Sequence, residues 1–168
     1  ESIVERLASA QEGEARPVEL QVVQSPEVNA FALPGGHIFV LEGLLSQVRS
    51  EDELAGVLAH EIGHVALRHS IQNLARQMGV GWVLSAFWKD LDGLTALLLG
   101  EAGNLTQLAF TREQEAEADA FGVKLAARAG FRAQSLADFL GRLNEGRLQP
   151  AFLSDHPAPQ DRQDRLSS

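Results

Sequence analysis

The sequence has 168 residues, of which 45% are hydrophobic and 22% are charged, as in an ordinary globular protein. This length predicts one domain over residues 1–168 with a substantial core. The net charge of −9 argues against nucleic acid as a partner, and the absence of cysteine excludes disulfides and cysteine metal ligands.

The N-terminal part predicts a helix, a small sheet and a second helix. Apolar residues at helical spacing predict a helix over residues 1–13. Residues 18–41 predict a small antiparallel sheet with a turn at Pro34-Gly35-Gly36, and residues 42–49 predict a short helix. His37 is expected to be a surface or packing residue of this sheet.

Residues 51–78 predict one long, central helix that contains an H-E-x-x-H motif. Histidines four apart lie on one helical face, so His60 and His64 can bind one ion. Glu61 can reach a water molecule on that ion. Two neutral nitrogen ligands and a carboxylate base are typical of zinc peptidases.

The two ends of this helix carry further polar residues. Ser50 and Glu53 predict a capping box at its start. Arg68 and His69 are expected to face solvent or to cap the helix. His69 lies about 140° from His64 in helical phase, which makes it a poor ligand candidate.

Residues 79–110 contain two apolar blocks, at 80–88 and 94–99. Neither block reaches the roughly 18 residues that a membrane span needs. We expect one or two short helices packed over the domain. The alternative is a flap that exposes apolar residues to lipid or to a partner; these are Trp82, Phe87 and Trp88.

The C-terminal part predicts further helices. Thr111 and Gln114 predict a capping box for a helix that ends at Gly130. A second helix is expected over residues 133–145. A loop over residues 146–158 and a final helix over residues 159–166 follow.

The helix that follows Thr111 offers several carboxylates as a third metal ligand. Glu115 shares a face with small residues suited to close helix packing. Glu113 and Glu117 lie about 160° away, which favours a solvated face. Asp119 comes one turn after Glu115, where it could orient a ligand histidine.

H-E-x-x-H followed by E-x-x-x-D resembles the gluzincin peptidases. The long gap from His64 to Glu115 resembles the HtpX-like and CAAX-prenyl-protease-type branch, which is peptidase family forty-eight of the metallo class. Further matches are Asn29-Ala30-Phe31, Pro34-Gly35-Gly36, Gly43-Leu44-Leu45, and His156-Pro157 with Arg162. A metzincin would instead need Gly at 67 and His at 70, where this chain has Leu67 and Ser70.

The resemblance implies an α+β fold, mainly helical and zincin-like, with a small antiparallel sheet along the active-site cleft. It implies one zinc ion per chain, held by His60, His64 and Glu115, with Glu61 as general base. The edge strand with Asn29, Ala30 and Phe31 is expected to pair with extended substrate.

The sequence leaves three possible roles of His156 open. It could donate a hydrogen bond to the oxyanion, helped by Arg162. It could instead fill the open zinc position as a plug. The third reading is a loop histidine fixed by Pro157.

The expected function is zinc-dependent hydrolysis of internal peptide bonds, in protein quality control. The alternatives are a plugged, proteolytically quiet binding or chaperone-like module, and a structural zinc site, which would normally need four protein ligands.

The expected partner is a polypeptide, and the sequence does not indicate an oligomeric state. Because the chain begins at Glu1, we expect a processed piece from which a signal or anchor was removed. Membrane association could come from such a segment or from residues 80–100. The cell envelope is the favoured location, periplasmic or membrane-associated, with the cytoplasm as the alternative.

Overall fold

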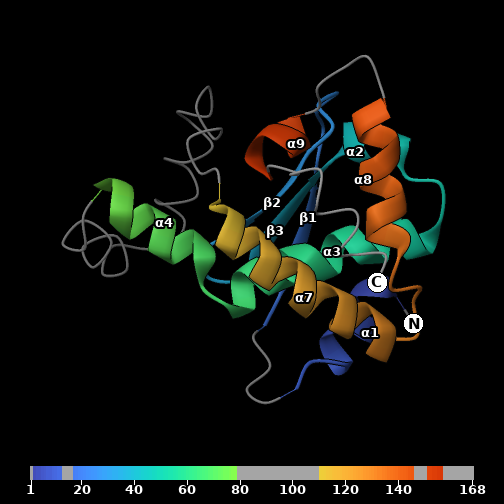
Figure 1. The fold of residues 1–168 in the computed structure, drawn as a ribbon, viewed down its shortest axis with the longest axis horizontal. Coiled ribbons are helices and arrows are strands. Elements are labelled where there is room, and N and C mark those ends of the chain that lie inside the picture. The colour runs from blue at the N-terminus through green and yellow to red at the C-terminus, as the bar shows by residue number, and fades with distance from the viewer. Residues whose placement is uncertain (1, 13–16, 79–109, 146–150, 157–168) are drawn as a thin grey trace.

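The computed structural model describes residues 2–12, 17–78, 110–145 and 151–156 (Figure 1). These residues form a mainly helical α+β fold with one three-stranded sheet, which confirms the predicted class. The strands are β1 (Glu19–Val23), β2 (Ala30–Leu33) and β3 (His37–Leu41). The helices are α1 (Ile3–Ser9), α2 (Glu42–Gln47), α3 (Glu51–Ala66), α4 (His69–Met78), α7 (Arg112–Arg128), α8 (Ser135–Glu145) and α9 (Ala151–Asp155).

The sheet is mixed, which corrects the expectation of an antiparallel one. Its strand order is β1-β3-β2, with β2 antiparallel and β1 parallel to β3. Alternating apolar residues specify which face of a strand is buried but do not specify its neighbour, so the parallel pair was not predictable from the pattern. His37 is half-buried, and its Nδ1 lies 3.2 Å from a Glu19 carboxylate oxygen.

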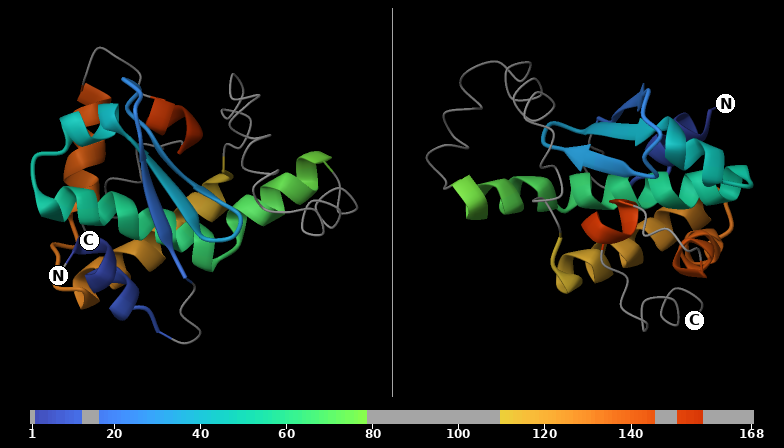
Figure 2. Two further views of the ribbon diagram at one scale, coloured as in Figure 1. Left: turned by 180° about the vertical axis from the view of Figure 1, so that it is seen from behind. Right: turned by 90° about the horizontal axis from the view of Figure 1, so that it is seen from above.

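Helix α3 is the central element of the fold, as its apolar circumference predicted. It lies between the sheet and α7 (Figure 2), and α1 and α8 also contact it. Its residues from Ala55 to His64 are all buried. The side chains of the H-E-x-x-H motif therefore project into the protein interior.

Small residues allow α3 and α7 to approach closely. A Cβ atom at Gly122 of α7 would lie only 3.0 Å from the backbone nitrogen of His60. A Cβ atom at Gly63 of α3 would lie 3.0 Å from the carbonyl oxygen of Ala118. The predicted small-residue face of α7 is buried, and it brings Glu115 and Asp119 against α3.

The expectation of one helix over residues 51–78 is wrong, because the chain breaks between α3 and α4. The backbone N–H groups of Leu67 and Arg68 bond to the carbonyls of Gly63 and Val65, and Arg68 has a φ of 60°. A left-handed conformation costs a non-glycine residue about 1–2 kcal/mol. The hydroxyl of Ser70 donates to the carbonyl of Ala32 at 2.7 Å, which anchors the new helix to β2.

The predicted capping boxes have different outcomes. At the start of α7, the Thr111 hydroxyl accepts from the N–H of Gln114, and the Gln114 side chain accepts from the N–H of Thr111. At the start of α3, the Ser50 hydroxyl accepts from the N–H of Glu53. The Glu53 carboxylate, however, turns to the N–H of Arg49 at 2.7 Å, so this box is only half formed.

A short helix lies within the predicted loop at residues 146–158. In α9 the N–H of Phe152 donates to the carbonyl of Val28 at 3.1 Å. The Asn29 amide donates to the Asp155 carboxylate at 2.7 Å. These contacts fix α9 against the start of β2 and set the position of His156.

Several expectations concern residues outside the described ranges. These are the apolar segment at 79–109, its role as a flap or membrane contact, Arg162, Pro157 and the final helix at 159–166. Among the described helices, none is long and apolar enough to cross a membrane.

Candidate metal centre

Helix α3 presents its two motif histidines to a glutamate of α7. The Nε2 atoms of His60 and His64 lie 3.0 Å apart. Glu115 places one carboxylate oxygen 3.5 Å from His60 Nε2 and the other 3.4 Å from His64 Nε2. All three side chains are fully buried or nearly so. Helical spacing predicted that His60 and His64 share a face, and the family resemblance added Glu115.

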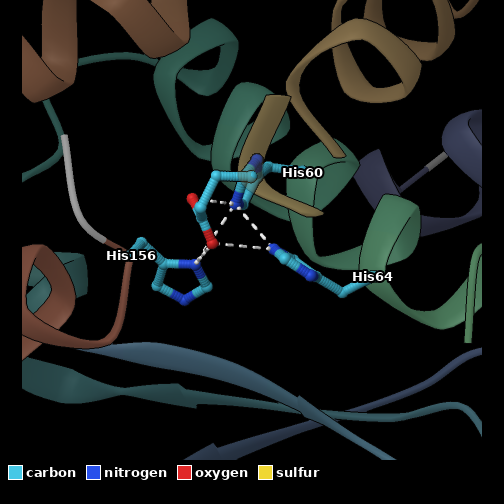
Figure 3. A group of neighbouring side chains, drawn as sticks. His60, His64 and His156 are labelled. Atoms are coloured by element: carbon cyan, nitrogen blue, oxygen red, sulfur yellow. Dashed lines mark hydrogen bonds and ion pairs between the residues drawn. The ribbon is translucent and has the colours of Figure 1, made fainter. Parts of the chain in front are cut away.

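His156, which directly follows α9, reaches the same point. Its Nδ1 lies 3.0 Å from a Glu115 oxygen and 3.2 Å from His60 Nε2. Figure 3 shows the rings of His60, His64 and His156 converging. The side chains of His60, His64, Glu115 and His156 thus each offer one ligand atom, and these atoms lie within 4.8 Å of one another.

These atoms lie close enough together to share one metal ion. Zinc–nitrogen and zinc–oxygen distances of about 2.0–2.2 Å place tetrahedral ligand atoms roughly 3.3–3.6 Å apart. The individual contacts given above, which involve both Glu115 oxygens, run from 3.0 to 3.5 Å, and the four ligand atoms all lie within 4.8 Å of one another. The donor set is also suitable, because imidazole and carboxylate are common zinc ligands.

The protonation states of the site also suit a metal. Burial alone would raise the pKa of Glu115, but His156, His60 and His64 outweigh it and hold that pKa below its usual range. Burial lowers the pKa of His64 well below its ordinary value, and Glu115 offsets this only in part. An ionised carboxylate and a neutral imidazole are the forms that bind metal.

Asp119 contacts His60, the first histidine of the H-E-x-x-H motif, on the ring nitrogen that faces away from the other ligand atoms. Its Oδ1 is 3.0 Å from His60 Nδ1. An ionised carboxylate can only accept a hydrogen bond, so the proton of a neutral His60 sits on Nδ1. The Nε2 atom of His60 then presents its lone pair to the point where the other ligand atoms meet.

The remaining predicted residues take different positions. Glu61 is fully buried, and its Oε1 lies 3.4 Å from His156 Nε2. Asn29 is buried and bonded to α9, while the Ala30 backbone N–H donates to the Asn29 side chain at 2.9 Å. Phe31 is half-buried and stacks on Phe39 with ring centroids 5.3 Å apart.

A cavity of about 190 Å³ opens beside His64. Its wall includes His64 of α3, the end of β2 and the turn that follows it. Side chains from the α3–α4 junction complete the lining; these are Val65, Arg68, Ser70 and Ile71. The cavity therefore lies between the turn after β2 and His64.

Two residues that contact His64, His69 and Phe110, were not predicted from the sequence. His69 was expected to face solvent or to cap a helix, but it is 1% exposed, and its Nδ1 lies 3.0 Å from His64 Nδ1. The prediction assumed that the helix continues through Arg68, but the helix breaks there. No glycine or proline at this point indicates the break. Phe110 stacks on His64 with centroids 3.8 Å apart, and no local pattern pointed to it.

A buried H-E-x-x-H helix with a glutamate from a second helix defines a metallopeptidase domain. Comparison with known proteins agrees: the profile described as peptidase family M48 matches residues 1–168. The chain belongs to this family, and the predicted resemblance is confirmed.

The chain is also similar to named proteases. It is 39% identical over 150 residues to mitochondrial metalloendopeptidase OMA1 of Schizosaccharomyces pombe, covering 86% of this chain and 44% of that protein. It is 32% identical over 171 residues to the beta-barrel assembly-enhancing protease of Escherichia coli, covering 94% of this chain and 35% of that protein. The chain thus spans less than half the length of these relatives.

Proposed function

We propose that residues 1–168 form a single zinc-dependent metalloendopeptidase domain, with one zinc ion held by His60, His64 and Glu115. The observation that carries this proposal is the convergence of their side chains in a buried site, where the contacts between ligand groups measure 3.0–3.5 Å. Membership of peptidase family M48 and the metalloendopeptidase relatives support it.

The side chains of His60, His64 and Glu115 would hold the zinc ion, which would supply Lewis acidity and make water a better nucleophile at neutral pH. Residues of the chain would transfer the proton and orient the ligands. Glu61 follows His60 on α3, where its carboxylate takes the proton of the attacking water and passes it to the leaving amine. Asp119 keeps the His60 proton on Nδ1 and thereby keeps Nε2 available.

The proposed substrate is an extended polypeptide. Strand β2 lies at an edge of the sheet that the described residues form, because the strand order is β1-β3-β2. We propose that an extended segment pairs with this edge at Asn29, Ala30 and Phe31, where it would replace the Asn29 side chain as acceptor of the Ala30 N–H. The adjoining cavity can receive a side chain. The E. coli relative's name refers to assembly of beta-barrels, and we propose protein quality control in a cell envelope as the setting.

A second candidate is a self-occluded, proteolytically quiet state of the same domain. His156 places Nδ1 3.0 Å from Glu115 and 3.2 Å from His60, in the position of a fourth ligand. The Asn29–Asp155 hydrogen bond holds the end of α9, which directly precedes His156. His156 then acts as a plug, and the donor role, with help from Arg162, requires α9 to move.

Cleavage of casein by the zinc-loaded domain, followed by mass spectrometry of the products, tests the proposal. Wild-type protein should release internal fragments, and a Glu61→Gln variant that retains zinc should not. Under the plug role His156→Ala gains activity, and under the donor role it loses activity. Equal cleavage by wild type and Glu61→Gln would contradict the proposed chemistry.

A further inference from the structure

The contact between His64 and His69 has no part in the chemistry described above. His69 Nδ1 lies 3.0 Å from His64 Nδ1, and His69 Nε2 lies 3.1 Å from Glu117 Oε2. His69 is 1% exposed, whereas the Glu117 side chain is 63% exposed. The contacts therefore run from the surface of α7 to a proposed metal ligand in the interior.

We propose that His69, anchored by Glu117, is the positioning residue for His64, as Asp119 is for His60. This inference rests on the proposed metal site. It assigns a role to a buried histidine outside the H-E-x-x-H motif, and to a glutamate that helical phase placed among solvated residues.

The hydrogen positions follow from the metal-binding form of His64. A neutral imidazole that offers Nε2 to a metal carries its proton on Nδ1. That N–H donates to the unprotonated Nδ1 of His69. The neutral His69 then carries its own proton on Nε2 and donates it to the Glu117 carboxylate. Each contact has one donor and one acceptor, so both ring orientations are fixed.

The backbone supplies a second, independent argument. His69 is the first residue of α4, and it reaches His64 because Arg68 adopts a φ of 60°. In an uninterrupted helix, His69 would point about 140° away from His64. The strained junction is held by the Ser70 hydroxyl, which donates to the Ala32 carbonyl at 2.7 Å. Phe110 stacks on the His64 ring.

Two amide substitutions at position 69 separate a positioning role from simple packing. Asparagine places its side-chain oxygen near the histidine Nδ1 position and can still accept from His64. Glutamine places its amide near the Nε2 position, where it meets Glu117 but not His64. Both replace an imidazole by an amide, so a packing role predicts similar effects.

Zinc affinity is measured by competition with a chelator, and Co²⁺ absorption spectra report ligand geometry. His69→Gln should weaken zinc about 10- to 100-fold and alter the Co²⁺ spectrum. His69→Asn should stay within about threefold of wild type, because it retains the acceptor. Equal affinities for the two variants, or wild-type affinity in His69→Gln, would overturn the proposal.

If the variants at position 69 do not fold, substitutions of exposed residues on α7 provide a second test. Glu117→Ala should weaken zinc about two- to fivefold, as expected for loss of an exposed charged contact. Glu113→Ala, on the same face of α7 and also exposed, is the matched control and should not change affinity. Equal affinities in these two variants would overturn the role of Glu117. Failure of the wild-type protein to bind zinc would instead overturn the proposed function.

Discussion

The close approach of α3 and α7 makes Gly122→Ala an informative perturbation. The added Cβ would lie 3.0 Å from the His60 nitrogen and 3.1 Å from two backbone carbons, of Ala59 and His60. Ordinary contacts begin at 3.4 Å, so the helices must separate locally by 3.4 − 3.0 = 0.4 Å. Backbone atoms cannot swing aside as a flexible side chain can, so the whole helix must shift.

The substitution is expected to affect both stability and metal binding. Overpacking costs about 1–3 kcal/mol, and the better helix propensity of alanine recovers about 1 kcal/mol. Unfolding free energy should therefore fall by about 0–2 kcal/mol. Metal–ligand distances tolerate only about ±0.2 Å, and Glu115 and Asp119 move with α7. We expect zinc affinity to fall about 10-fold or more.

Gly56→Ala is the matched control for this experiment. Its Cβ would lie 3.0 Å from the nitrogen of Leu136, so it overpacks α3 against α8 rather than against α7. Urea unfolding of the metal-free proteins should give similar stability losses, whereas chelator competition should show weakened zinc only in Gly122→Ala. Wild-type zinc affinity in Gly122→Ala, or equal weakening in both variants, would show that the distance between α3 and α7 does not set the geometry of the metal site.

Three further predictions concern individual side chains. Glu61→Gln should keep zinc and fold but lose peptide hydrolysis by about 10²–10⁴ or more in a fluorogenic peptide assay, and substantial turnover would contradict the base role. Asp119→Ala should weaken zinc about 10- to 100-fold by chelator competition, and unchanged affinity would speak against orientation of His60. Arg142→Leu should destabilise the fold by about 1.5–3 kcal/mol near neutral pH, because it removes the guanidinium that bonds to the buried Glu53 carboxylate. Burial raises the pKa of Glu53, but the bonds from Arg142 and from the backbone leave it below the ordinary value. This stabilisation is therefore present above the ordinary carboxyl pKa and is lost as pH falls through the folded value, so urea unfolding of both proteins should converge in acid. A difference that does not change with pH would argue against this origin.

Local patterns predicted the elements that form the centre of the site. Spacing of four residues placed His60 and His64 together, and the phase of the small residues on α7 separated Glu115 from Glu113. These features depend on helical geometry alone, which the sequence specifies well. The cap at Thr111 fixed where α7 begins and hence its phase.

Features that depend on distant contacts were not predictable from those patterns. The break at Arg68 has no glycine or proline signal, so His69 was assigned the wrong direction. Position 156 is set by the contacts of α9 with Val28 and Asn29, about 120 residues earlier in the chain. Such contacts follow from tertiary packing rather than from periodicity.

The most direct test of the metal centre is the zinc content of three purified proteins, measured by elemental analysis. With His60, His64 and Glu115 as ligands, we expect about one zinc per chain in the wild type and in Glu113→Gln, and a loss of zinc in Glu115→Gln. Full zinc in Glu115→Gln together with loss in Glu113→Gln would contradict the assignment of the third ligand. Absence of zinc from the wild type after loading would contradict the metal centre itself.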